Sequence, residues 1–135
     1  MKHFPFKPIE QTMLNIKDSE EKYPVNHVYC VGRNYTSHAK EMGVDDRKPP
    51  FIFTKPNWTL TTSDVKYPNG TNDLQHEVEL VIAIGESLSI FGFAVGVDLT
   101  RRDIQSLAKE QGKPWFSGKN FLGSAPISYI VPINK

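Results

Sequence analysis

Apolar and polar residues in this chain alternate mainly with the two-residue period of β-strands. In the segment Glu77–Ile84, every second residue from Val78 onward is aliphatic, which places the aliphatic side chains on one face of a strand. Glu77 and Glu79 then share the opposite face. This segment therefore predicts a strand with two carboxylates side by side.

A second strong strand is predicted over Phe91–Asp98. Its alternate positions Gly92, Ala94 and Gly96 are small and share a face with Asp98. Small neighbours are expected to leave room beside that carboxylate, as a binding site would need.

Shorter strands are predicted over His27–Val31 and Phe51–Thr54, and the polar, proline-broken stretch through Pro24 is expected to form an irregular arm. A short helix is predicted to begin at Asn34 or Thr36 and to run through Met42.

The clearest helix is predicted from about Arg101 to Gln111. Thr100 and Asp103 have the spacing of a capping box, and Gly112 is a stop signal. Apolar residues form one stripe along it, at Ile104, Leu107 and Ala108. Because strands outnumber helices and no strand–helix unit repeats, the fold class expected is a β-rich α+β domain.

Composition and charge exclude several classes of protein. The 135 residues are 39% hydrophobic and 23% charged, which suits one globular domain with its own core. Sixteen Lys and Arg face fifteen Asp and Glu, so the net charge of +1 gives no electrostatic reason to expect nucleic acid or a membrane as partner. Cys30 is the only cysteine, which excludes an internal disulfide, and no apolar stretch resembles a signal peptide or a membrane span. A cytoplasmic location is expected.

The carboxylates carry the first candidate chemistry. Glu77 and Glu79 repel each other unless solvent, a proton or a cation separates their charges, and Asp98 could supply a third oxygen ligand. Carboxylate ligands without cysteine suit Mg²⁺ or Mn²⁺. An exposed strand with a solvated acidic face explains the same pattern equally well, so both interpretations stay open at this point.

Other polar residues are less specific when taken singly. His38 and Glu41 are neighbours at i, i+3 on the predicted short helix, which suits a general base and its orienting carboxylate, although a solvated ion pair fits the pair alone better. Arg102 and Gln105 stand at i, i+3 near the start of the longer helix, where an arginine can grip a carboxylate. Lys119 follows two aromatic residues and a glycine. Taken alone, these three side chains are expected to be ordinary charged or polar groups on the surface.

Six short motifs follow one another along the chain. They are Gly32–Tyr35 (GRNY), His38–Glu41 (HAKE), Phe53–Pro56 (FTKP), His76–Leu80 (HEVEL), Val97–Gln105 (VDLTRRDIQ) and Gly118–Phe121 (GKNF). In this order they resemble the fumarylacetoacetate hydrolase family, and within it the single-domain acylpyruvate hydrolase and oxaloacetate decarboxylase branch. The resemblance covers about Val28 to Pro132.

The resemblance implies a β-rich roll of mixed sheets, a homodimer, and a small-molecule 2-oxo acid substrate. It implies one Mg²⁺ or Mn²⁺ held by Glu77, Glu79 and Asp98, and a catalytic His38–Glu41 dyad on a lid. Positions lining the substrate pocket are matched by Arg102, Gln105 and Lys119, and further motif positions assigned to substrate binding are matched by Arg33 and Lys55.

Two departures from the family pattern concern the extent of the fold. The connection at 86–90 is shorter than is usual in the family, and the family's C-terminal third has no counterpart after Lys135. Residues 1–135 are therefore expected to form a single catalytic domain of this type that is incomplete.

The hypothesis that follows is metal-dependent cleavage of a carbon–carbon bond in a 2-oxo acid through a metal-bound pyruvate enolate. For an acylpyruvate, His38 oriented by Glu41 would activate water, Lys119 and Gln105 would stabilise the developing oxyanion, and Arg102 would position the substrate. Oxaloacetate could lose CO₂ to give the same enolate. An isomerase or hydratase of 2-oxo-dienoic acids in the same family, and a non-catalytic metal-binding β-domain, are the alternatives.

Overall fold

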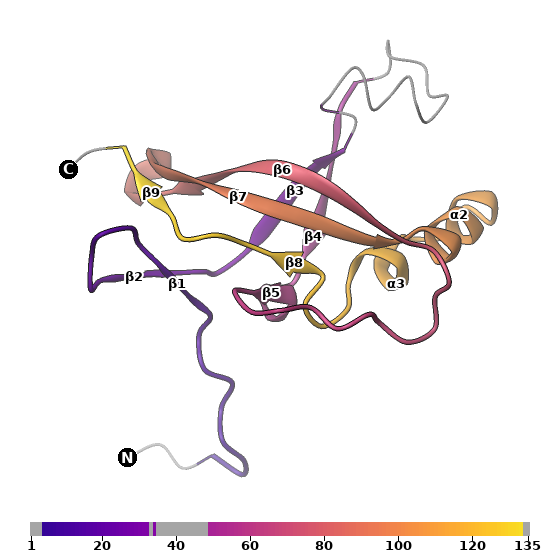
Figure 1. Cartoon of the computed structure of the whole chain (residues 1–135), viewed down its shortest axis with the longest axis horizontal. Helices are drawn as coiled ribbons and strands as arrows, with labels where there is room; N and C mark the ends of the chain where they lie inside the picture. The colour runs from indigo at the N-terminus through magenta and orange to yellow at the C-terminus, as the bar shows by residue number, and fades with distance from the viewer. Residues whose placement is uncertain (1–3, 33, 35–48, 134–135) are drawn as a thin grey trace.

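The structure is a computed structural model, and it describes residues 4–32, 34 and 49–133. Its longest elements are β6 (Leu74–Ile84) and β7 (Ile90–Arg101), which form one antiparallel hairpin that crosses the molecule (Figure 1). In its register Glu77 lies opposite Asp98, and Glu79 lies opposite Gly96. Strand β6 begins earlier than predicted and ends at the predicted residue, β7 extends its predicted segment at both ends, and the side chains keep their predicted faces.

Further strand pairs accompany this hairpin. Antiparallel partners are β3 (Val28–Gly32) with β4 (Phe51–Lys55), and β9 (Val131–Pro132) joins the edge of β7. A parallel pair is formed by β5 (Leu60–Thr61) and β8 (Ala125–Pro126). The mixture of parallel and antiparallel pairs, with few short helices, confirms the β-rich α+β class.

The prediction of an irregular arm through Pro24 is wrong for its second half. Residues Met13–Asn15 form β1 and Lys22–Pro24 form β2, which pair as an antiparallel hairpin. Leu14 on β1 is buried while its two strand neighbours are exposed, so a single inward residue anchors the hairpin. Three-residue strands are too short for an alternation pattern to reveal them.

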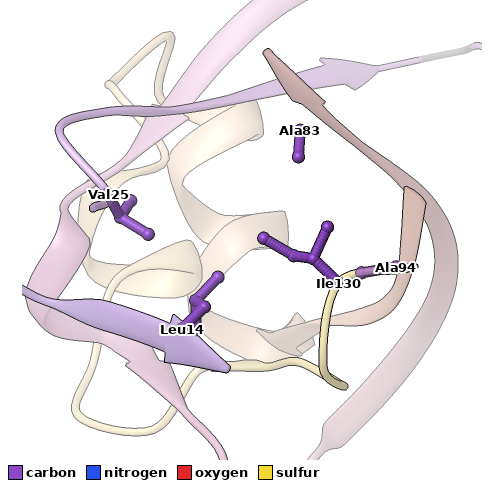
Figure 2. Close-up of a cluster of buried hydrophobic side chains, with 5 residues drawn as sticks. All are labelled: Leu14, Val25, Ala83, Ala94 and Ile130. Carbon is purple, nitrogen blue, oxygen red and sulfur yellow. The ribbon is translucent and has the colours of Figure 1, made fainter. Parts of the chain in front are cut away.

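The buried core lies on the face of the β6–β7 hairpin that also carries Glu77 and Asp98. Its side chains come from β1, the segment after β2, β6, β7 and the segment before β9, and they converge in Figure 2. They are Leu14, Val25, Ala83, Ala94 and Ile130.

The small residues of β7 have two effects: Gly96 borders the same cavity as Asp98, which agrees with the expected room beside that carboxylate, and the glycines also permit close packing. A Cβ atom added to Gly92 would lie 2.4 Å from the carbonyl oxygen of Val131, and one added to Gly96 would lie 2.8 Å from the Val81 side chain. Glycine at position 92 lets the C-terminal segment pack directly against the hairpin, and glycine at position 96 makes room for the Val81 side chain.

Two helices follow β7, and both lie at the same end of the hairpin (Figure 1). They are α2 (Arg102–Glu110) and α3 (Phe116–Lys119). The predicted capping box is wrong: Arg101 is the N-cap of α2 and makes no side-chain cap. Asp103 instead accepts hydrogen bonds from the Thr71 hydroxyl at 2.6 Å and the Asn72 amide at 3.0 Å, which fasten α2 to the loop before β6.

The buried side of α2 is polar. Arg102 and Gln105 are its buried residues, whereas Leu107 of the predicted apolar stripe is half exposed. Gly112, with a φ of +60°, ends the helix as its sequence position predicts. In the described ranges, no helix is long and apolar enough to cross a bilayer.

The short connection between β6 and β7 is a tight turn. The Gly85 amide donates a hydrogen bond to the Ser89 carbonyl at 2.8 Å, and Glu86–Leu88 form one 3-10 turn. Ser87 and Leu88 have φ values of 53° and 61°. The hairpin is therefore closed within a few residues, at the end opposite α2.

Candidate active site

The site is organised around two carboxylates that face each other across the β6–β7 pair. Glu77 and Asp98 are register partners, and both side chains reach the ammonium group of Lys119. Asp98 is only 6% exposed, and the Glu77 side chain is 18% exposed. The sequence period alone placed Glu77 beside Glu79, and the strand pairing adds Asp98 directly opposite.

Lys119 comes from the last residue of α3, and its ammonium group uses all three of its hydrogens. It donates to Glu77 Oε2 at 3.0 Å, Asp98 Oδ2 at 2.6 Å and Thr100 Oγ1 at 2.7 Å. The residue is 3% exposed. A lysine buried to this degree needs such charge-assisted bonds, because an unpaired ammonium away from water is costly.

Lys55, at the end of β4, is a second buried cation on the other side of Asp98. Its ammonium lies 3.0 Å from Asp98 Oδ1, and it donates hydrogen bonds to the Lys119 carbonyl and to the Ser124 hydroxyl. Burial, at 1% exposure, lowers the pKa of Lys55, and the charge of Asp98 works against that shift. Lys55 thus fixes both the carboxylate and the backbone that carries Lys119.

Arg102, the first residue of α2, holds the other side of Glu77. Its guanidinium donates to Glu77 Oε1 at 2.5 Å, to Gln105 Oε1 at 2.6 Å and to Gln75 Oε1 at 3.0 Å. The Gln105 carbonyl oxygen is therefore engaged by Arg102, and the amide NH₂ of Gln105 remains as its donor group. The polar face of α2 is buried because it forms this part of the site.

These charges shift the acidity of the groups around them. Burial alone would raise the pKa of Glu77, but the charge of Lys119 and the hydrogen bonds from Arg102 and Lys119 outweigh it and hold that pKa below its usual value. On β3, burial and then the charge of Asp98 raise the pKa of the Cys30 thiol to about 11. Cys30 is accordingly a protonated thiol at neutral pH and a poor nucleophile.

A cavity of about 930 Å³ connects the charged cluster to a largely apolar wall. The wall includes Phe51 and Phe53 of β4 and Trp115, with Trp115 edge-on to Phe51 at a centroid distance of 5.2 Å. Lys119 Nζ lies 5.3 Å from the centre of the Phe53 ring. A ligand in this cavity would contact buried charges and flat aromatic surface together.

The described residues contain no ready cluster of three His, Cys, Asp or Glu side chains arranged to hold a metal ion. The donor set nonetheless suits a hard cation, because Glu77, Glu79 and Asp98 offer carboxylate oxygens on one face of the hairpin. Asp98 Oδ1 is buried and accepts no hydrogen bond of good geometry within this part of the chain, although Lys55 lies beside it. The residues fit a divalent cation, with Lys119 now between two of them.

Three predicted site residues, Arg33, His38 and Glu41, lie outside the described residues, and their roles stay predictions. Of the others, the structure brings together Lys55, Glu77, Asp98, Arg102, Gln105 and Lys119 through direct contacts, and Glu79 follows Glu77 on the same face.

The site also contains three polar residues that the sequence analysis did not single out. Thr100 and Ser124 are completely buried acceptors for Lys119 and Lys55, and Gln75 accepts from Arg102. Thr100 and Gln75 share the strand face of Asp98 and Glu77, so the two-residue period could have found them. Ser124 carries no such signal.

Comparison with known proteins identifies the family to which this site belongs. The family described as "Fumarylacetoacetate (FAA) hydrolase C-terminal" matches residues 27–134. The chain belongs to the fumarylacetoacetate hydrolase family. The resemblance carried by the six motifs is thereby confirmed, and so is the strand-rich fold that it implied.

Relatives within the family act on small 2-oxo acids, according to their names. Oxaloacetate tautomerase YcgM of Escherichia coli is 38% identical over 122 residues, which are 82% of this chain and 56% of the relative. Oxaloacetate decarboxylase of Dictyostelium discoideum is 36% identical over 121 residues, 80% of this chain and 56% of the relative.

A solved structure extends the similarity to three dimensions. Fumarylpyruvate hydrolase of Pseudomonas aeruginosa, in complex with Mn²⁺ and pyruvate, is 41% identical with a TM-score of 0.93, over 98% of this chain and 64% of that chain. The present chain thus spans about half the length of the curated relatives it matches and less than two thirds of this structure.

Proposed function

We propose that this chain forms the active site of a metal-dependent enzyme that acts on 2-oxo acids, cleaving a carbon–carbon bond by acylpyruvate hydrolysis, oxaloacetate decarboxylation or both. The observation that carries the proposal is the buried charge cluster in which Glu77 and Asp98 face Lys55, Lys119 and Arg102 at one cavity. Buried charges concentrated in a cavity are typical of catalytic sites.

The proposed metal is Mg²⁺ or Mn²⁺, bound by Glu77, Glu79 and Asp98. Such an ion would supply Lewis-acid stabilisation of the negative charge that develops on the oxygen of a 2-oxo acid. The presence of Mn²⁺ and pyruvate in the similar fumarylpyruvate hydrolase structure supports this choice of ion and substrate class.

The cationic and amide groups of the site have distinct proposed roles. The Arg102 guanidinium binds the substrate carboxylate, for which its planar fork of donors is suited. The Lys119 ammonium and the Gln105 amide NH₂ donate hydrogen bonds to developing oxyanion charge. His38, oriented by Glu41, removes a proton from the attacking water when the substrate is an acylpyruvate.

The aromatic wall favours acylpyruvate hydrolysis over decarboxylation as the principal reaction. Phe51, Phe53 and Trp115 offer flat apolar surface beside Lys119. An unsaturated or apolar acyl group can bury its surface there. Oxaloacetate has no comparable group and would leave this wall in contact with water.

Homodimer formation is part of the proposal. One face of the β6–β7 hairpin is apolar and exposed, including Val78 at 63%, Leu80 at 61% and Val95 at 55%. A contiguous exposed apolar surface of this kind is typical of a protein interface. A second copy of the chain is the partner we propose for it.

The proposed function is tested by turnover of acetylpyruvate, oxaloacetate and a 2-hydroxy-dienoate with Mn²⁺ and with excess EDTA. We expect metal-dependent turnover of the first two, and loss of turnover in E77Q. Preference for the dienoate would favour the isomerase or hydratase alternative. Full activity in excess EDTA would contradict the metal chemistry.

A further inference from the structure

The position of the Lys119 ammonium has a consequence for metal binding. It lies between Glu77 and Asp98, 3.0 Å and 2.6 Å from their oxygens, with its third hydrogen on Thr100. These carboxylates are two of the three that we propose as ligands of the divalent cation. One ammonium ion therefore already pairs with two of the carboxylates that the metal would use.

Charge balance shows why the two cations compete. Among the described residues, the cluster holds three carboxylates, Glu77, Glu79 and Asp98, and three cations, Lys55, Lys119 and Arg102, so the formal charges of these six side chains sum to zero. A divalent ion added to an unchanged cluster would raise that sum to +2. It would also lie close to a buried ammonium, where repulsion between like charges is strong because little water screens it.

The backbone of Lys119 is held in place, so the side chain is the part of this residue that can move when a metal ion binds. Its backbone amide donates to the Trp115 carbonyl within α3, and its carbonyl oxygen accepts from buried Lys55. The four-carbon stem of a lysine can rotate about such a fixed backbone. The Phe53 ring, which lines the same cavity, already lies 5.3 Å from Nζ, within range of a cation–π contact.

We propose that Lys119 is the built-in counter-ion of the metal site, and that a divalent cation must displace its ammonium from Glu77 and Asp98 in order to bind. This inference rests on the proposed function, since it takes Glu77 and Asp98 as metal ligands. Displacement turns the ammonium toward the cavity, where a substrate oxyanion can accept its hydrogens. Metal binding thereby prepares Lys119 for the substrate.

The test is Mn²⁺ binding by isothermal titration calorimetry, without substrate, to wild type, K119M, K119R and K113M. We expect K119M to bind Mn²⁺ at least about tenfold more tightly than wild type, because no ammonium has to leave. K119R keeps the cation and should not gain affinity. K113M removes the same charge from an exposed residue outside the site, so its affinity should match that of wild type.

Thermal unfolding gives a second measurement of Mn²⁺ binding. It can be used even when K119M is poorly stable without metal. Without metal, K119M should melt below wild type because two buried carboxylates lose their shared partner. Added Mn²⁺ should raise the melting temperature of K119M by more than it raises that of wild type. Equal or weaker Mn²⁺ binding by K119M, together with an equal or smaller thermal shift, would overturn the inference.

The two proposals fail in different ways. If wild type turns over its substrates with Mn²⁺ but K119M binds the ion no more tightly, the counter-ion role is wrong and the proposed function stands. If K119M gains Mn²⁺ affinity but wild type turns over none of the substrates, the counter-ion role stands and the proposed function is wrong.

Discussion

At the scale of single residues, the site depends on charges that satisfy one another instead of water. Three of its charged residues, Lys55, Lys119 and Asp98, are less than 10% exposed. Each of them forms an ion pair with another of the three or with Glu77. Removing one member of such a cluster leaves an unpaired buried charge, which typically costs about 3–5 kcal/mol of stability. Stability and the proposed function therefore depend on the same side chains.

The lowered pKa of Glu77 predicts how acid affects folding. As the pH falls, this carboxyl is protonated in the unfolded chain before it is protonated in the folded chain. The charged carboxyl therefore stabilises the fold fully above about pH 4.5, its ordinary pKa. That stabilisation is lost as the pH falls through the lower pKa of the folded state. E77Q should therefore lose less unfolding free energy than wild type between pH 7 and pH 3. The additional loss in wild type measures how strongly Lys119 and Arg102 favour the charged form of Glu77.

Urea unfolding followed across that pH range measures this difference. E86Q is the matched control, because Glu86 lies in the exposed turn between β6 and β7. It should keep the wild-type pH profile. An E77Q profile as steep as that of wild type would show that Lys119 and Arg102 do not hold Glu77 in its charged form.

Residue identities at the site were predictable, whereas their pairing was not. The HEVEL, VDLTRRDIQ and GKNF motifs name Glu77, Asp98, Arg102 and Lys119, and the strand period places the acidic side chains on one face. The Lys119 contact with Glu77 spans 42 positions of the chain, and that of Lys55 with Ser124 spans 69. Such contacts depend on strand register and packing, which a local pattern does not contain.

At the scale of elements, the positions of the long strands were predicted well, but which face of each element is buried was not. A strand or helix usually buries its apolar face, yet β6 covers its glutamates and exposes Val78 and Leu80. In α2, Arg102 and Gln105 are buried while Leu107 is half exposed. Each inversion occurs where the element contributes polar groups to the site.

Short elements escaped prediction for a different reason. The β1–β2 hairpin and α3 contain only three or four residues per element, fewer than a periodic pattern needs. The predicted capping box does not form because its two side chains make hydrogen bonds to other groups. Thr100 accepts from Lys119, and Asp103 accepts from Thr71 and Asn72.

At the scale of the whole molecule, much of the apolar surface of the described residues lies outside the core. Besides the face of the β6–β7 hairpin, the β3–β4 pair exposes Tyr29 at 68% and Ile52 at 67%. The buried hydrophobic cluster is small by comparison and includes two alanines. This distribution of apolar surface is the physical basis for the proposed homodimer.

A charge placed on the exposed hairpin face should weaken that association. Leu80 is opposite Val95 in the hairpin, and both are more than half exposed. We expect wild type to behave as a dimer in light scattering coupled to size exclusion, and L80E to shift toward the monomer because a buried unpaired carboxylate is unfavourable.

L122E is the control for the added charge, since Leu122 is 81% exposed and lies in the loop between α3 and β8. It should remain dimeric. A monomeric wild type at high concentration, or an L80E variant as dimeric as L122E, would assign the apolar face to some other partner.

The central claim is that Glu77, Glu79 and Asp98 bind a divalent cation together with a 2-oxo acid. Its most direct test is calorimetric titration of Mn²⁺ into wild type, D98N and D64N with oxalate present as a mimic of the enolate; Asp64 is an exposed aspartate outside the site. We predict one Mn²⁺ per wild-type chain, bound more tightly with oxalate than without it. D64N should match wild type, and D98N should lose at least about tenfold in affinity. Equal binding by D98N, or no effect of oxalate on wild type, would contradict the account.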